Sequence, residues 1–206
     1  MNMTCIISGD IINSRKVDPT IWLNPLKALM KEWGETPQTW EIYRGDSFQL
    51  EIKQPQYGLL AAIRIKACIK SIEKLDVRMG IGIGQKSYDA QKITEANGEA
   101  FINSGEIFED LKKLKQSLAI RSPWPQLDTE LNLMFRLALI ALDKWSPATA
   151  QIVAVAIANR SLSQKELGDI MERTQSTISE AQKRAHYDEI MDLVSFYEQC
   201  IMEKIS

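Results

Sequence analysis

Apolar and polar residues follow two different patterns along the chain, and the change comes near residue 121. Before it, short apolar or alternating runs, typical of β-strands, are interspersed with longer stretches in which apolar residues recur at helical spacing. The first six elements follow the order β-α-β-β-α-β, which predicts a ferredoxin-like sheet. The predicted strands are 4–8, 39–44, 47–53, 77–84 and 117–121, and the predicted helices are 19–33, 57–75 and 98–114.

After residue 121 every periodic stretch is helical. We expect helices over 128–145, 147–159, 164–171 and from 176 onward, and the last can continue without a break to Met202. The intervening sequence SPWPQ at 122–126 holds two prolines one residue apart, which disfavours regular structure. The fold class predicted is α+β, with a ferredoxin-like domain over 1–121, a linker over 122–127 and an all-α domain over 128–206.

Residues 161–185 predict a helix, a tight turn and a second helix, which is the arrangement of a helix-turn-helix. Ser163 is a suitable N-cap for the first helix, and Glu166 three residues later completes a capping box. Gly168 is expected where the two helices approach closely. The residues expected to face the core are Leu167, Ile170, Met171 and Ile178.

The second helix of this segment is expected to begin at a cap provided by Thr174 or Ser176 and to present a polar face. Such a helix lies in the major groove when a helix-turn-helix binds DNA. Glutamine pairs with adenine edges, serine and threonine reach bases or phosphates, and lysine and arginine contact the backbone. The predicted DNA-binding residues are Gln164, Gln175, Ser176, Thr177, Ser179, Lys183 and Arg184.

Charge weighs against strong DNA binding by a single copy. The whole chain has a net charge of −2, and residues 146–206 carry six Lys/Arg against nine Asp/Glu. Because phosphate neutralisation supplies most of the affinity for DNA, we expect a homodimer or another partner to be needed. A protein-docking hairpin stays open as the alternative, since helical hairpins in general show this apolar spacing and Glu172 stands where glycine is usual in the turn.

Two acidic residues are expected to meet at one corner of the sheet. Asp10 follows the first predicted strand, and Asp46 lies in the turn before the third. The first and third strands of a ferredoxin-like sheet are antiparallel neighbours, so the end of one lies beside the start of the other. Two adjacent carboxylates repel each other unless a cation lies between them, and Mg²⁺ suits such a pair. Hydrogen bonding of either aspartate to the turn backbone is the alternative.

The loop after Asp10 is a candidate for binding the phosphate groups of a nucleotide. It leads into the first long helix, where backbone amides and an arginine can hold an anion. Together with the glycine of the neighbouring turn, the predicted phosphate-binding residues are Asn13, Ser14, Arg15 and Gly45.

Four segments resemble the palm domain of class III nucleotide cyclases and polymerases: GDIINSR at 9–15, YRGDSF at 43–48, VRMGIGIG at 77–84 and NGEAFINSG at 97–105. The resemblance implies a metal-binding role for Asp10 and Asp46. It also implies an asparagine and, four residues later, an arginine on the helix at 98–114, where this chain has Ile102 and Glu106. A negative Glu106 opposes the charge that develops on phosphate, so we expect no cyclase activity.

The glycines at 80, 82 and 84 alternate within the predicted strand 77–84. They do not open a helix after a strand, as the glycines of a dinucleotide-binding fingerprint do. Close packing of a helix or a ligand on the strand is the expected reason for them.

With the helical tail SQKELGDIMERTQSTIS, the same motifs resemble the SatD family of bacterial proteins over nearly the whole chain. Our main hypothesis is a DNA-binding transcriptional regulator whose palm-like domain senses a nucleotide or a phosphorylated ligand. An Mg²⁺-dependent enzyme acting on a nucleotide and a module that binds only other proteins are the alternatives.

Composition predicts a cytoplasmic protein. Cys5, Cys68 and Cys200 lack metal-ligand spacing and fit reduced thiols. The first ten residues carry no basic stretch and reach an aspartate too early for a signal peptide. The longest apolar stretch, 131–142, is short and contains Arg136, so no membrane span is expected.

Overall fold

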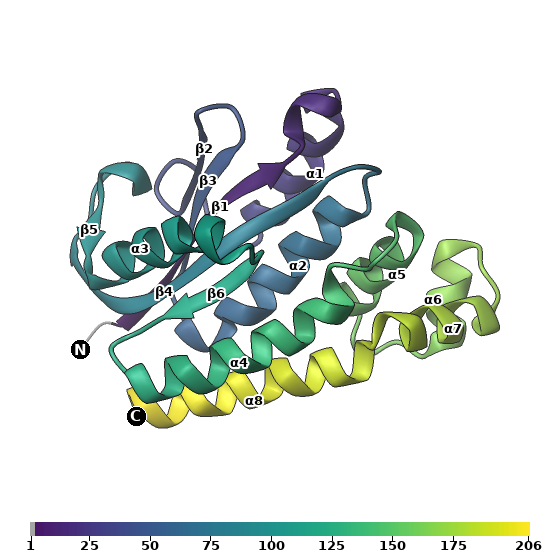
Figure 1. Ribbon diagram of the computed structural model, residues 1–206. Coiled ribbons are helices and arrows are strands. Elements are labelled where there is room, and N and C mark those ends of the chain that lie inside the picture. Colours follow the sequence, from purple (N-terminus) through teal and green to yellow (C-terminus); the bar gives the residue numbers. More distant parts are fainter. Residues whose placement is uncertain (1–2) are drawn as a thin grey trace.

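The computed structural model describes residues 3–206 and places six strands in one mixed sheet (Figure 1). The strand order is β2-β3-β1-β4, with β6 parallel to β4 and β5 paired with the far end of β4. All the other pairs are antiparallel. The strands are β1 (Met3–Ile12), β2 (Trp40–Tyr43), β3 (Ser47–Ile52), β4 (Asp76–Tyr88), β5 (Asn97–Gly98) and β6 (Leu118–Arg121).

Helices cover both faces of this sheet. Helices α1 (Pro19–Lys31) and α2 (Gly58–Lys70) lie on one face, and α3 (Glu99–Leu114) lies on the other (Figure 1). Alternate residues of β1 serve the two faces, as the pleat of a strand requires. Ile7 belongs to the core with Trp22 of α1 and Leu59 of α2, whereas Ile6 packs with Ala100 of α3. Three 3-10 turns complete this part: η1 (Ser14–Lys16), η2 (Pro55–Tyr57) and η3 (Ile93–Glu95).

The alternating glycines of β4 let α3 lie directly against the strand. A Cβ atom added at Gly80, Gly82 or Gly84 would come within 2.9, 2.2 and 2.7 Å, respectively, of a backbone nitrogen of α3. These distances are shorter than any normal carbon contact. The predicted close packing on this strand is therefore confirmed, and the element that approaches is a helix.

Five helices follow the sheet: α4 (Pro125–Leu142), α5 (Pro147–Ala158), α6 (Gln164–Met171), α7 (Gln175–Ala185) and α8 (Tyr187–Ile205). The long helices α4 and α8 are antiparallel neighbours, and α6 and α7 lie beyond the C-terminal end of α4 (Figure 1). Phe135 of α4 and Tyr197 of α8 belong to the same buried cluster as the sheet residue Ile7. The Tyr197 hydroxyl also donates to the carbonyl of Pro55 at 3.1 Å. One continuous core thus joins the helical part to the sheet.

A buried lysine links α2, β4 and α4. Lys66 is fully buried, and its ammonium donates to Asp76 at 3.0 Å, to Asp143 at 2.7 Å and to the Ser117 hydroxyl at 3.1 Å. Lys70 donates to the same Asp76 carboxylate at 3.2 Å. The three donors of the Lys66 ammonium are thereby satisfied, which is what a charge buried at this depth requires.

Two predictions about the helical part were wrong. Helix α4 begins at Pro125, inside the predicted linker 122–127, because proline is tolerated at the first position of a helix, where its missing N–H has no helical partner. The last helix does not run unbroken from 176 to 202. It is interrupted at His186, whose left-handed backbone (φ 53°) ends α7 and starts α8 in a new direction.

Several boundaries in the sheet part also differ from the sequence patterns. The first strand extends to Ile12 and the fourth to Tyr88, well beyond the predicted 4–8 and 77–84. The helix predicted over 57–75 ends at Lys70. The β2–β3 hairpin is confirmed, as are the helices 19–33 and 98–114 to within two residues at each end. Within residues 3–206, no helix combines the length and apolar character needed to cross a bilayer.

Candidate functional site

The first helix of the segment 161–185 is fixed by its N-terminus. Ser163 accepts a hydrogen bond from the backbone N–H of Glu166, and the Glu166 carboxylate accepts one from the backbone N–H of Ser163 at 2.7 Å. The capping box and the bounds 164–171 of this helix are therefore confirmed. Hydrogen bonds from the side chain and then the backbone of Ser163 hold the pKa of Glu166 below its ordinary value.

A tight turn over 172–174 reverses the chain between α6 and α7. Glu172 adopts the left-handed backbone conformation, with φ 53°. The N–H of Arg173 donates to the carbonyl of Gly168 at 2.8 Å, and a Cβ at Gly168 would lie 2.7 Å from the carbonyl oxygen of Arg173. The expected close approach at Gly168 is confirmed, and its partner is the turn backbone.

Replacing Glu172 by glycine is expected to stabilise the fold by about 0.5–1 kcal/mol. A side chain in the left-handed region contacts its own carbonyl unfavourably, and glycine removes that contact. The matched control is Glu172→Ala, which removes the carboxylate but keeps the Cβ and should give no gain. Urea denaturation of both variants measures the difference. Equal stability of the two variants would show that the turn carries no backbone strain.

Helix α7 has one buried and one polar side. Thr174 caps it by accepting from the N–H of Thr177 at 3.2 Å, which confirms one of the two expected caps. The buried side consists of Ile178, Ala181 and Ala185. The predicted DNA-binding residues Gln175, Ser176, Thr177, Lys183 and Arg184 are exposed, and Ser179 is half-buried. An ion pair of 3.5 Å joins Arg184 to Glu180 on the same helix.

The α6–α7 hairpin packs on α5 through a small core of its own. The buried members of this core are Ile152, Ala156, Leu167, Ile178 and Ala181. The exposed polar residues of α7 lie outside this core. The hairpin is therefore held as a rigid unit while its polar side stays accessible.

Two residues of the hairpin were predicted in the wrong environment. Ile170, expected in the core, is 58% exposed, because the buried side of this short helix is formed by Leu167 and Gly168. Gln164, expected to contact DNA, is half-buried and donates from its side-chain amide to that of Gln182 at 2.9 Å. Gln164 thus ties α6 to α7.

Asp10 and Asp46 lie next to each other where β1 pairs with the start of β3, but their carboxylates have different partners. Asp10 lies inside β1, opposite Ser47, and the N–H of the next residue, Ile11, donates to the carbonyl of Asp46 at 3.1 Å. Asp46 lies in the turn before β3, as expected. The expectation that Asp10 follows the strand was wrong, because β1 continues to Ile12.

Arg78 of β4 engages the Asp10 carboxylate with two hydrogen bonds, from Nε at 3.1 Å and from Nη2 at 2.8 Å. These residues are opposite each other in the β1–β4 register, so their side chains share one face of the sheet. Arg78 was not among the residues predicted from the sequence. Its place in the predicted strand 77–84, which pairs with β1 in the structure, is the one signal that could have suggested it.

The Asp46 carboxylate accepts a short hydrogen bond of 2.5 Å from the Ser14 hydroxyl. Asp10 already has its counter-ion in Arg78. A divalent cation between the two aspartates would have to displace that guanidinium. Over the part of the chain that the structure describes, no cluster of three His, Cys, Asp or Glu side chains is arranged as a metal site. The Mg²⁺ site stays a prediction that the side-chain partners do not favour.

Two of the four predicted phosphate-binding residues form hydrogen bonds within the protein, and the other two are exposed. Asn13 donates to the carbonyl of Lys74 at 3.1 Å, and Ser14 is buried against Asp46. Arg15 and Gly45 are exposed. The N-terminus of α1 is capped by the carboxylate of Asp18, which accepts from the N–H of Thr20 at 2.9 Å. A phosphate at this helix end would meet a negative cap, so the arrangement does not support the expected cradle.

The helix that corresponds to the catalytic helix of cyclases has its own structural contacts. Glu106 forms an ion pair with Arg121 of β6, and Ile102 is 54% exposed. Neither residue supplies a positive charge toward Asp10. This arrangement agrees with the sequence expectation of no cyclase activity, which stays a prediction.

Comparison with known proteins does not extend these observations, since no protein-family model and no curated protein sequence matches the chain. The resemblances to the SatD family and to cyclase-like palm domains therefore stay predictions. The site with the clearest chemistry is the exposed polar side of α7.

Proposed function

We propose that residues 161–185 form a helix-turn-helix through which this protein binds DNA as a transcriptional regulator. The observation that carries the proposal is the exposed polar side of α7, which presents Gln175, Ser176 and Thr177 at its start and Lys183 and Arg184 in its last turns. Amide and hydroxyl groups near the start of a recognition helix can read base edges, and the cations further along can neutralise phosphates.

The construction of the hairpin supports this proposal. The turn of three residues, the glycine at the close approach and the separate core with α5 give α6 and α7 a fixed relative position. A recognition helix needs such support, because base readout depends on a rigid side-chain geometry.

The rest of the chain fits the role of a scaffold for the α6–α7 hairpin. We include in the proposal that the order β2-β3-β1-β4 belongs to a ferredoxin-like, palm-type unit. Nucleotide sensing by this unit is left out of the proposal, because Arg78 and Ser14 occupy the carboxylates of Asp10 and Asp46.

Lys183→Ala combined with Arg184→Ala is expected to weaken binding to all DNA sequences. The slope of log K against log salt is negative, and each lost phosphate contact reduces its magnitude by about 0.9, so the magnitude should fall by about 2 in the double variant. Fluorescence anisotropy with a labelled random-sequence duplex, titrated at several salt concentrations, measures the slope.

The matched control is Lys112→Ala combined with Lys113→Ala, which removes the same charge from the exposed end of α3. This variant should bind DNA like the unmodified protein. Equal losses in the two double variants would contradict a contact through α7 and indicate a response to net charge alone.

A further inference from the structure

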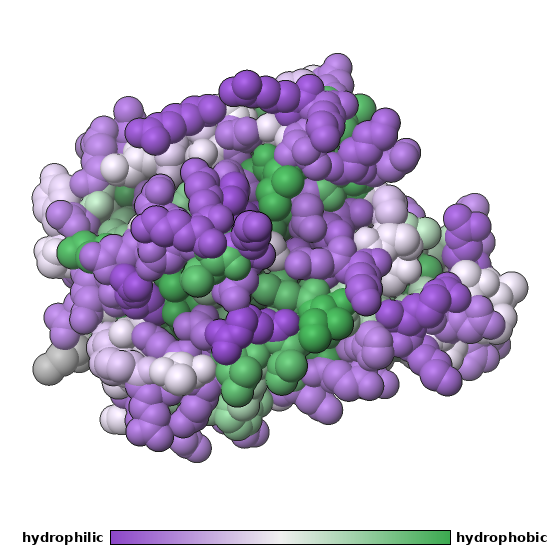
Figure 2. All heavy atoms as spheres, in the orientation of Figure 1, coloured by the Kyte–Doolittle hydropathy of each residue, from purple (hydrophilic) through white to green (hydrophobic). Residues whose placement is uncertain are grey.

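Helix α4 carries an apolar stripe that no part of the described chain covers. Leu133, Leu137 and Ile140 are 51%, 61% and 61% exposed. They recur at spacings of four and three residues and therefore lie along one side of the helix. Figure 2 shows apolar residues gathered over α4 and the adjoining part of α8. Exposed apolar residues in a contiguous group indicate an interaction site.

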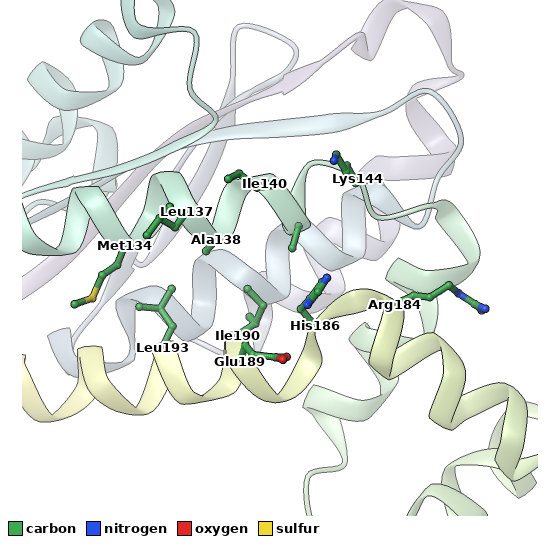
Figure 3. Close-up of a pocket in the computed structure, with 11 residues that line it drawn as sticks. Met134, Leu137, Ala138, Ile140, Lys144, Arg184, His186, Glu189, Ile190 and Leu193 are labelled. Atoms are coloured by element: carbon green, nitrogen blue, oxygen red, sulfur yellow. The ribbon is translucent and has the colours of Figure 1, made fainter.

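The stripe borders a groove of about 500 Å³ between α4 and α8 (Figure 3). Leu137 and Ile140 line it from α4, and Ile190 and Leu193 line it from α8. Its end near α7 is polar, with Lys144, Arg184 and Glu189. The groove is long and shallow rather than enclosed, which suits a helix better than a small molecule.

Charges are placed symmetrically about the middle of the stripe. Glu130 lies seven residues before Leu137, and Lys144 lies seven residues after it. Seven residues are close to two helical turns, so Glu130 falls on the side of α4 that carries Leu137. Lys144 lies two residues beyond the end of α4 at Leu142 and lines the same groove as Leu137. Both residues are exposed, and neither makes an ion pair within residues 3–206.

We propose that this surface binds a second copy of the chain, with the two α4 helices packed antiparallel about a two-fold axis at Leu137. A two-fold interface must be self-complementary. In this register Leu137 meets its own copy, and Glu130 lies opposite Lys144 of the partner subunit at both ends. An unrelated protein would not need charges of opposite sign at equal distances from the centre.

The dimer would also separate the two α7 helices along the direction of the paired α4 helices. The two copies of Leu142, the last residue of α4, would lie about 15 Å apart along the direction of the helices, given a rise of about 1.5 Å per residue. Helix α7 lies further out, beyond the C-terminal end of α4 (Figure 1). The separation therefore increases toward the spacing of about 34 Å between successive major grooves. Dimerisation itself does not depend on whether α7 binds DNA.

Sedimentation equilibrium of the full chain tests the proposal. Because the stripe is smaller than a standard interface, we expect a dissociation constant on the order of 10 μM. Leu137→Glu puts two like charges at the axis and should weaken association about 100-fold. Ile102→Glu, at an exposed apolar residue of α3, is the matched control and should leave association unchanged.

Charge exchange tests the register. Glu130→Lys and Lys144→Glu should each weaken self-association several-fold, because each places like charges opposite one another. The variant with both changes should associate like the unmodified protein, and an equimolar mixture of the two single variants should form heterodimers.

Three results would overturn the proposal. The first is a mass of 23.4 kDa at all concentrations up to about 200 μM, which points to a different occupant of the stripe. The others are self-association that survives Leu137→Glu, or a double charge variant whose self-association is not restored. Circular dichroism confirms that each variant is folded.

Discussion

Gly82→Ala is expected to destabilise the protein by about 3 kcal/mol, at the upper end of what one added methyl group costs in a packed interior. The new Cβ would lie 2.2 Å from the backbone nitrogen of Ser104 and 2.3 Å from the carbonyl oxygen of Ala100. Both atoms belong to the backbone of α3, so no side-chain rotation relieves the contact. The helix would have to move off the sheet.

Gly105→Ala adds the same methyl group but is expected to stabilise the protein. Nothing lies within 4 Å of a Cβ at Gly105, and this residue is inside α3. Alanine should therefore stabilise α3 by about 0.5–1 kcal/mol, because glycine is the poorer helix former. Urea denaturation followed by circular dichroism measures both variants. If Gly82→Ala cost less than about 1 kcal/mol, the close packing of α3 on β4 would be wrong.

Asp76→Asn is expected to cost about 3 kcal/mol. This carboxylate accepts from Lys66 at 3.0 Å, from Lys70 at 3.2 Å and from the N–H of Val77 at 2.8 Å. Lys66 is fully buried, so the loss of Asp76, the less exposed of its two counter-ions (21% against 47%), leaves a buried ammonium with Asp143 as its only carboxylate partner among the described residues. Removing one partner of a buried ion pair costs more than the pair contributes as a whole.

Lys66→Met is the informative comparison, because it removes the buried charge itself. Asp76 keeps Lys70, and the side chain of Asp143 is 47% exposed and can be hydrated. We expect Lys66→Met to cost about 1–2 kcal/mol, less than Asp76→Asn, and the double variant to cost less than the sum of the two. Additive losses in thermal and urea unfolding would contradict the described network.

Local signals predicted much of the fold. The capping box at Ser163, the cap at Thr174 and the β2–β3 hairpin each depend on a few adjacent residues, and all were identified. The glycines of β4 predicted a close approach to the strand but did not identify the element that approaches, which is α3. The antiparallel pairing of β1 with β3 was expected from the sequence of elements, and it brings Asp10 and Asp46 to adjacent positions.

Long-range partners could not be predicted in the same way. Arg78 and Lys66 act through residues on other elements, and such pairs become visible only when the sheet register is known. The break at His186 depends on a left-handed backbone that a non-glycine residue rarely adopts, so the helical pattern gave no warning. Ile170 was assigned to the core because periodicity cannot tell which part of an apolar side is covered in a short helix.

Retention of sheared genomic DNA by the immobilised full chain tests the central claim, that α7 binds DNA, most directly. At about 50 mM salt we expect fragments to be retained and then released as the salt approaches about 200 mM. Repeated selection should enrich fragments that share a sequence, and Gln175→Ala should relax that preference while leaving total retention nearly unchanged. Absence of retention at low salt, or retention that Lys183→Ala with Arg184→Ala does not reduce, would contradict the account.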